Sequence, residues 1–347
     1  MKPKTFWILF IFLCIVASIT YFVFYHPQPD TRVSRMGETL FKDLAVNRIA
    51  EVHITRYENE NLETIKLSKK DSAWIVENLF DYYADFTSIL ELVEKLKNAK
   101  IGRHFEASPD TLSRLALHDP AEHNIGQDEK SIRVRIFDGE QGTLVDVLVG
   151  KHRESSGING GHYLKPTEQN TIYLVDQTFQ FIGRHSQDWI KSELLDIPAE
   201  NIETVTCLNP EDQSIVYKIK RHEKGAPPEL QDADDTRSIK THRVESVFDT
   251  LSSLSISNVA AKLEGISEEI TGFNSLPVLD FALFDGNVYR VYTGKKAVGE
   301  NNGEYNGFYF KIDGPQKSSW IYVISEWVNQ SIVTDPEMFF EKMEDNP

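Results

Sequence analysis

Two stretches of the chain nearly repeat each other: Ile136–His152 reads IFDGEQGTLVDVLVGKH, and Leu283–Lys296 reads LFDGNVYRVYTGKK. Each has the pattern of a strand, an Asp-Gly turn, a second strand and a final Gly-Lys. An Asp-Gly pair between two alternating segments predicts a tight or bulged hairpin, because glycine tolerates a positive φ. We therefore expect the same hairpin twice, over Ile132–Val149 and Val278–Thr293.

The similarity extends on both sides of these hairpins. IAEVHI at 49–54 matches IETVTC at 202–207, and both segments alternate apolar and polar residues as half-buried strands do. FTSILELVEKL at 86–96 and RVESVFDTLSSL at 243–254 share an apolar helical face. Because the matches keep their order along the chain, we interpret them as an internal repeat.

Local signals inside the repeat differ between the copies. Asp85 is a good N-cap for the first helix, whereas Arg243 stands at the matching place, so the second helix is expected to begin near Thr241. The pairs Gly150-Lys151 and Gly294-Lys295 are interpreted as strand ends with a solvated lysine. They are not phosphate loops, because the spacing GxxxxGK[ST] is absent from the sequence.

In each copy the expected strands cluster and the helices are few. The predicted fold class is α+β: two tandem copies of a mainly antiparallel sheet-plus-helix module, preceded by one transmembrane helix. The predicted segments are 1–25 for an N-terminal transmembrane anchor, 26–39 for a linker, 40–196 for the first repeat, 197–334 for the second repeat and 335–347 for a C-terminal tail.

The anchor rests on Thr5–Tyr25, a run without a charged residue. About 20 apolar residues span the hydrocarbon core as a helix, because every backbone group is then bonded internally. A cleaved signal peptide would end in a small-x-small site, but here the run ends in bulky residues. Cys14 follows Phe12-Leu13, which is a poor lipidation context. We therefore expect the run to be retained.

Charges around this run bear on its orientation. Lys2 and Lys4 precede it and favour a cytoplasmic N-terminus, although Arg32, Arg35 and Lys42 follow it and weaken the asymmetry. The expected location is the inner (cytoplasmic) membrane, with a single pass and with the C-terminal part in the periplasm or otherwise outside the cytoplasm.

Composition excludes some classes of protein. The 347 residues carry a net charge of -16, and such a surface repels nucleic-acid phosphates and anionic lipid headgroups. The chain has two cysteines, Cys14 and Cys207, so no disulfide framework is expected. Cys207 lies in an alternating apolar pattern and is predicted to be a small core residue rather than a nucleophile.

The sequence contains none of the motifs HExxH, CxxC and GxSxG, and no GxGxxG after a strand. Asp232, Asp234 and Asp235 resemble part of a calcium loop, but Arg237 and Arg243 stand where the glycine and the closing glutamate belong. We therefore predict no cofactor, and we assign no residue to catalysis, to cofactor binding or to a metal.

Histidines provide the remaining candidates for chemistry. His118 and His123 flank a turn, and His152 and His162 bracket a loop that could chelate a metal, although a solvated loop explains the pattern better. His185 lies near an aspartate at 188 and a tryptophan at 189, with no identifiable nucleophile beside it.

Two loops rich in asparagine and glycine follow the Gly-Lys pairs, at 152–161 and 296–307. Asn159 and Asn301 lie in these loops and could form a binding rim, since binding residues are often carried by loops on a rigid scaffold. Ordinary hairpin connections explain the two loops about as well, so the residues that contact a ligand or partner stay unknown.

Several segments together resemble one bacterial family, known as domain of unknown function 4340. They are ETLFKDLAVNRIAEVHI at 38–54, SAWIV at 72–76, YYADFTSILELVEKL at 82–96, LALHDP at 115–120, IRVRIFDG at 132–139 and DWIKSELLDIPAENIETV at 188–205. The resemblance implies a membrane-anchored, extracytoplasmic protein, often encoded beside gliding-motility-type ABC transporter components. It implies no site residues.

The leading hypothesis is a non-enzymatic, membrane-anchored extracytoplasmic protein that is an accessory component of an ABC-type transporter or envelope complex. Its expected partners are the membrane and a transporter permease or envelope proteins, and not nucleic acid. One alternative is an extracytoplasmic module that binds a glycan or small solute. Another is an unrecognised envelope hydrolase, which needs titratable groups such as His152, His162 and His185 in one cleft.

Overall fold

The computed structural model describes residues 35–153, 160–233, 237–299 and 304–341. Strands account for 43% and helices for 23% of it, so the structure is mostly antiparallel sheet. The expected α+β fold with a preceding transmembrane helix is therefore wrong. Among the described residues, no helix is both long and apolar enough to cross a membrane. The anchor predicted over Thr5–Tyr25 lies outside the described residues.

The physical reason for this correction lies in the lengths of the elements. The helix α2 (Phe86–Asn98) has only 13 residues, and the other described helices are shorter. They are α3 (Pro109–Leu115), α4 (Thr241–Phe248), α5 (Glu268–Thr271) and α6 (Glu326–Ser331). The strands β7 (Thr143–Arg153) and β17 (Val288–Val298) have 11 residues each. Long alternating segments therefore dominate the fold.

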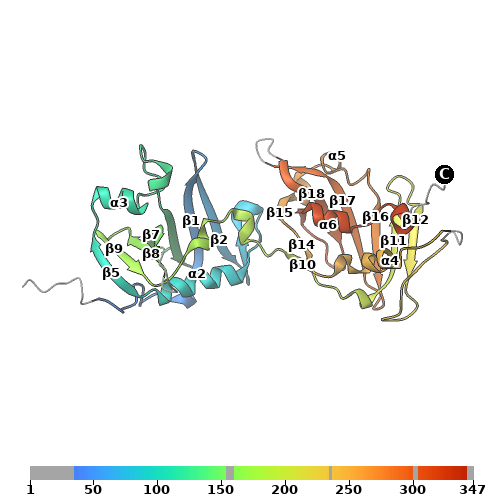
Figure 1. Cartoon of the computed structure of the whole chain (residues 1–347), viewed down its shortest axis with the longest axis horizontal. Helices are drawn as coiled ribbons and strands as arrows, with labels where there is room; N and C mark the ends of the chain where they lie inside the picture. Colours follow the sequence, from blue (N-terminus) through green and yellow to red (C-terminus); the bar gives the residue numbers. More distant parts are fainter. Residues whose placement is uncertain (1–34, 154–159, 234–236, 300–303, 342–347) are drawn as a thin grey trace, which may run out of the picture. The chain divides into compact units, whose positions relative to one another are not determined.

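The strands form two large sheets, drawn in blue to green and in yellow to red in Figure 1. The first sheet has the order β4-β3-β2-β1-β6-β7-β8-β9-β5 and the second has the order β13-β12-β11-β16-β17-β18-β19-β15. If β1 is matched with β11, the two orders are the same, except that β4 is added to the first. The two copies of the sequence pattern thus share one topology.

The other strands of the first sheet are β1 (Ile49–Glu58), β2 (Asn61–Lys70), β3 (Ala73–Val76), β4 (Tyr82–Tyr83), β5 (Ile101–Glu106), β6 (Ile132–Asp138), β8 (Gly161–Pro166) and β9 (Thr171–Val175). Those of the second are β11 (Ile202–Leu208), β12 (Ile215–Lys220), β13 (Glu229–Leu230), β15 (Asn258–Lys262), β16 (Val278–Leu283), β18 (Glu304–Asp313) and β19 (Trp320–Ile324). A small two-stranded sheet pairs β10 (Glu193–Leu195) with β14 (Leu254–Ser255).

The predicted hairpins are confirmed. In β6–β7, Ile132 lies opposite Val149, and in β16–β17, Val278 lies opposite Tyr292. The two turns differ in detail. Gly286 has the expected positive φ of 87°, whereas in the first turn a non-glycine residue, Gln141, has a φ of 64°. The first turn is longer, so the left-handed residue falls after the Asp-Gly pair.

The repeated Gly-Lys pairs have a structural role that the sequence did not reveal. A side chain on Gly150 would clash with the Leu115 carbonyl oxygen at the end of α3, and one on Gly294 would clash with the carbonyl oxygen that ends α5. Lys151 Nζ donates to the Arg114 carbonyl at 3.0 Å, and Lys295 Nζ donates to the Glu269 carbonyl at 3.2 Å. The strands continue past these pairs. The expectation of a strand end is therefore wrong, whereas both lysines are exposed as expected and in addition donate to a carbonyl near a helix C-terminus.

The chain divides into two compact units. Unit 1 contains residues up to Ile49, Ile54–Glu63 and Glu91–Ile182, and unit 2 contains Ala50–His53, Thr64–Leu90 and residues from Gly183 onward. The boundaries 40–196 and 197–334 proposed from the repeat stay a prediction.

Candidate functional site

The strongest candidate site is a groove of about 560 Å³ in unit 2, which we call the aromatic groove. Its aromatic lining residues are Tyr82, Tyr83, Tyr289, Trp320 and Tyr322. The others are Lys191, Glu193, Leu194, Leu195, Asn287, Ile312, Gly314, Pro315, Gln316, Lys317 and Ser318. A volume of this size is in the range of small-ligand sites in proteins.

The two tyrosines of β4 are held in place by an unusual turn. Phe80 and Asp81, which precede β4, have φ angles of 59° and 57°, in the left-handed region. This conformation is unfavourable for a bulky residue such as Phe80 and persists only where the surroundings impose it. Here the Phe80 carbonyl accepts a hydrogen bond from Trp320 Nε1 at 3.0 Å, and Asp81 lies 3.4 Å from the ammonium of Lys262. The turn therefore fixes both the tyrosines and the indole.

The rings of the aromatic groove pack edge to face. The centroid of the Tyr82 ring lies 5.1 Å from that of Trp320 and 5.8 Å from that of Tyr322, with interplanar angles of 90° and 76°. Tyr83 contacts Trp320 at 5.5 Å. These are the preferred geometries of aromatic pairs. Tyr82 is buried, whereas Tyr83 is 46% exposed, so Tyr83 presents apolar ring surface to solvent.

The hydroxyls of Tyr82 and Tyr322 are hydrogen-bonded and neutral. Tyr82 donates to the Lys191 carbonyl at 3.2 Å, and Tyr322 Oη lies 2.7 Å from Ser318 Oγ. Burial is the main cause that raises the pKa of both Tyr82 and Tyr322 above the usual value. Both phenols therefore stay protonated at neutral pH.

Gly314 lies against the ring of Tyr289, where an added Cβ would be only 2.7 Å from the ring.

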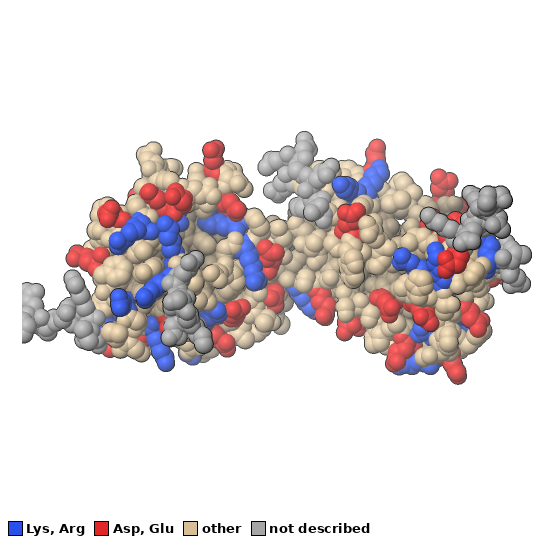
Figure 2. Space-filling view, viewed as in Figure 1, with Lys and Arg blue, Asp and Glu red and all other residues tan. Residues whose placement is uncertain are grey.

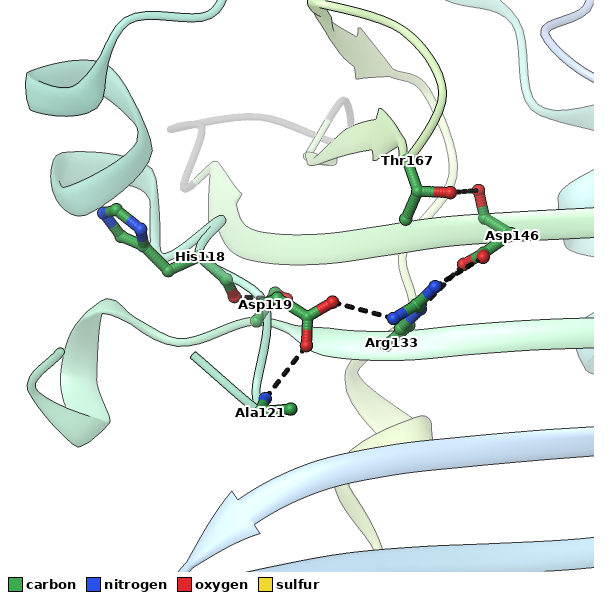
Figure 3. Close-up of polar contacts among 7 residues, drawn as sticks. His118, Asp119, Ala121, Arg133, Asp146 and Thr167 are labelled. Atoms are coloured by element: carbon green, nitrogen blue, oxygen red, sulfur yellow. Dashed lines mark hydrogen bonds and ion pairs between the residues drawn. The ribbon is translucent and has the colours of Figure 1, made fainter. Parts of the chain in front are cut away.

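A second polar cluster lies in unit 1 (Figure 3). Arg133 on β6 donates to both carboxylate oxygens of Asp146 on β7, at 2.9 Å and 2.6 Å, and to Asp119 at 2.8 Å. Asp119 also accepts from the backbone N–H of Ala121 at 2.9 Å. The hydrogen bond to Asp146 is the largest of the causes that raise the pKa of Arg133. Every group in this cluster is paired.

The repeat shows what this cluster does. Arg133 and Asp280 each lie four residues before a repeated phenylalanine, Phe137 and Phe284 respectively. Asp146 and Arg290 each lie four residues before a glycine of the repeated Gly-Lys pairs. Arg290 donates to both oxygens of Asp280 at 2.6 Å. The second copy thus holds the same cross-strand ion pair with its charges exchanged. Because either orientation is accepted, we interpret the pair as a contact that holds the hairpin together, not as a catalytic centre.

The structure brings His152 and His162 together. They lie opposite each other on β7 and β8, with ring centroids 5.1 Å apart. His162 is buried, and its Nδ1 accepts the backbone N–H of Phe179 at 3.1 Å. Burial, with help from His152 and Lys95, lowers the pKa of His162 to about 4. His162 is therefore a neutral hydrogen-bond acceptor inside unit 1.

The other histidines have local roles. The ring of His118 is buried and contacts Glu122 and Ser113, each at 3.0 Å, whereas His123 is exposed. His118 and His123, which flank a turn in the sequence, therefore do not form a shared site. The backbone N–H of His185 donates to an aspartate, Asp188, at 3.0 Å in a capping box at the start of a 3-10 helix.

The prediction for Cys207 is confirmed. Its side chain is fully buried, and burial raises the pKa of its thiol to about 12, so the thiol is a core group and not a nucleophile. The loop residues Asn159, Asn301, Asp234 and Asp235, which were considered from the sequence, lie outside the described residues.

Comparison with known families decides the classification. The family model described as Domain of unknown function (DUF4340) matches residues 74–269, which is more than half of the chain. The chain belongs to this family. The match in this DUF4340 protein includes Tyr82 and Tyr83 but ends before Trp320. Neither the curated proteins nor the solved structures gave a match.

The aromatic groove was missed by sequence reasoning. Its parts come from four separate stretches, at 82–83, 191–195, 287–289 and 312–322. The available signals were the adjacent tyrosines Tyr82-Tyr83 and the pattern Trp320-Ile321-Tyr322. Both patterns also suit ordinary half-buried strands, so neither one indicates a shared groove.

Proposed function

We propose that this DUF4340 protein is a non-enzymatic accessory component of an ABC-type transporter or a related envelope complex. It acts by binding, at the cytoplasmic membrane and outside the cytoplasm. The uncharged run Thr5–Tyr25 and what the family resemblance implies support this location. The net charge of -16 disfavours nucleic acid as a partner.

The observation that carries a binding role is the aromatic groove. Tyrosine and tryptophan supply large contact areas with few rotatable bonds, and they are enriched where proteins bind their partners. Tyr83 and Trp320 are held in place before any ligand arrives, which lowers the entropy lost on binding. A pre-arranged, half-exposed aromatic surface fits recognition.

The hydrolase alternative has less support. A hydrolase of this kind needs a base beside a nucleophile. His162 instead accepts a backbone hydrogen bond, and His185 takes part in a helix cap. The Arg133 cluster is an ion-pair network whose charges are exchanged in the second copy.

The accessory role is tested by crosslinking the tagged full-length chain in native membranes with a lysine-reactive reagent, followed by mass spectrometry. The expected result is recovery of an ABC-type permease or another envelope subunit in repeated preparations. Recovery of crosslinks within this chain alone would contradict the accessory role.

A second candidate function is an extracytoplasmic module that binds a glycan or small solute. The mixed lining of the aromatic groove favours it, since neutral polar side chains stand beside the rings. A ligand that binds only the folded state raises the melting temperature. A thermal-shift screen with wild type and the Trp320→Ala variant tests this function, and the expected shift is lost in the variant.

A further inference from the structure

The lining of the aromatic groove divides into ring surfaces and neutral hydrogen-bonding groups. The most exposed of its rings, Tyr83, lies in edge contact with Trp320. Asn287 and Gln316 add exposed amide groups, whereas the Ser318 hydroxyl is bonded to the Trp320 backbone and to Tyr322. A ligand that fits this lining has both apolar faces and many neutral donors and acceptors.

The charges of the groove point to a neutral ligand. Its charged lining residues are two lysines and one glutamate, Lys191, Lys317 and Glu193, and its lining includes no arginine. Arginine is the side chain best suited to bind carboxylate or phosphate groups in two-pronged fashion. On the visible face of the protein, acidic and basic side chains are interspersed rather than gathered in one patch (Figure 2).

The rings are pre-arranged for stacking. The indole N–H of Trp320 is already bound to the Phe80 carbonyl, so the ring is oriented before any ligand binds. The Tyr82 ring packs edge to face against the indole, at an interplanar angle of 90°. The hydroxyls of Tyr82, Tyr322 and Ser318 already have protein partners. Asn287 Nδ2 donates to Asp285 at 3.0 Å, so the Asn287 amide oxygen and the Gln316 amide are the groups offered to ligand hydroxyls.

We propose that the aromatic groove binds a neutral oligosaccharide, with a sugar ring against Tyr83 and Trp320 and sugar hydroxyls bonded to the side-chain amides of Asn287 and Gln316. The C–H face of a pyranose is apolar, and its rim carries hydroxyls that both donate and accept. These two properties match the ring surfaces and the neutral amides of the groove. This inference rests on the proposed binding function and names the ligand class.

The test uses the full-length protein in detergent and neutral hexasaccharides as probes: β-1,4-linked glucose, β-1,4-linked N-acetylglucosamine, α-1,4-linked glucose and β-1,3-linked glucose. Calorimetry and tryptophan fluorescence measure binding. At least one probe is expected to bind saturably. Trp320→Ala is expected to weaken it by about tenfold or more, which is the effect of losing one well-placed aromatic contact.

Two further variants serve as a control outside the groove and as a second test inside it. Trp327→Ala removes a tryptophan of the same unit that is 78% exposed and lies on α6, outside the groove lining, so binding is expected to be unchanged. Tyr83→Ala removes a half-exposed ring and is expected to weaken binding while the protein stays folded, which circular dichroism verifies.

Three results would overturn the inference. They are no saturable binding by any probe, equal weakening by Trp320→Ala and Trp327→Ala, and tighter, salt-dependent binding of oligogalacturonate than of every neutral probe. None of these results bears on the crosslinking of the chain to a transporter subunit, so failure of the sugar ligand and failure of the accessory role are distinguishable.

Discussion

Acidification is expected to destabilise unit 1 through the imidazole of His162. The pKa of this buried group is lowered from 6.5 to about 4 in the folded protein. Between these two values the unfolded chain binds a proton that the folded chain excludes. The contribution of neutral His162 to the free energy of unfolding is therefore fully present above pH 6.5 and is lost as the pH falls toward 4.

The magnitude follows from the depression of the pKa of His162. At pH 5 the solution is 1.5 pH units below the unfolded value, and each unit is worth about 1.36 kcal/mol. The expected loss in the free energy of unfolding between pH 7 and pH 5 is therefore about 2 kcal/mol. Protonation would also remove the Nδ1 lone pair that accepts the N–H of Phe179.

The assay is urea-induced unfolding at pH 7 and pH 5 of wild type and two variants. His162→Asn keeps a side-chain oxygen near the position of Nδ1 but cannot titrate. Its loss of unfolding free energy between pH 7 and pH 5 should therefore be about 2 kcal/mol smaller than the loss in wild type. His123→Asn removes an exposed histidine and should behave as wild type. A full wild-type loss in His162→Asn would show that His162 does not cause this pH dependence.

Three further predictions concern the repeat and the core. Gly150→Ala should lower the free energy of unfolding by about 1–3 kcal/mol, because the added Cβ would meet a helix carbonyl. Gly139 faces open space, so Gly139→Ala should not cause that loss, and urea titration compares the two variants. A double-mutant cycle on Asp280 and Arg290, each replaced by alanine, should give a coupling energy of about 0.2–1 kcal/mol for this half-exposed pair, and a coupling near zero would argue against a role in holding the hairpin. Cys207 should resist iodoacetamide at pH 8 in the folded protein and react once urea unfolds it, as peptide mass spectrometry can show; rapid reaction in the folded state would contradict its burial.

Local features of the fold could be predicted from the sequence. Asp85 accepts from the N–H of Thr87 at 3.0 Å at the start of α2, as its N-cap pattern predicts. The helix α4 begins at Thr241, as expected from the position of Arg243. Both hairpins follow from Asp-Gly pairs between alternating strands. Each of these signals is contained within a few neighbouring residues, which explains why sequence reasoning finds them.

Features that depend on distant segments could not be predicted. The sequence pattern predicts a strand end at Lys151, yet the strand continues and the exposed ammonium donates to a carbonyl on α3. Trp320 and Tyr82 look like ordinary strand residues, yet their edge-to-face contact builds the aromatic groove. The strained conformation of Phe80 leaves no trace in the sequence, because the residue is not glycine and its hydrogen bond to the indole spans much of the chain.

We propose that the protein works by binding through the aromatic groove. The most direct test replaces Tyr83 with the photo-reactive p-benzoylphenylalanine in the full-length protein, in living cells, and compares it with the same replacement of Trp327. Benzophenone inserts into nearby C–H bonds, so it captures either a protein or a glycan. If the groove binds a partner or ligand, we expect a discrete adduct from position 83 and none of that mass from position 327. No adduct from position 83, or the same adduct from both positions, would contradict this proposal.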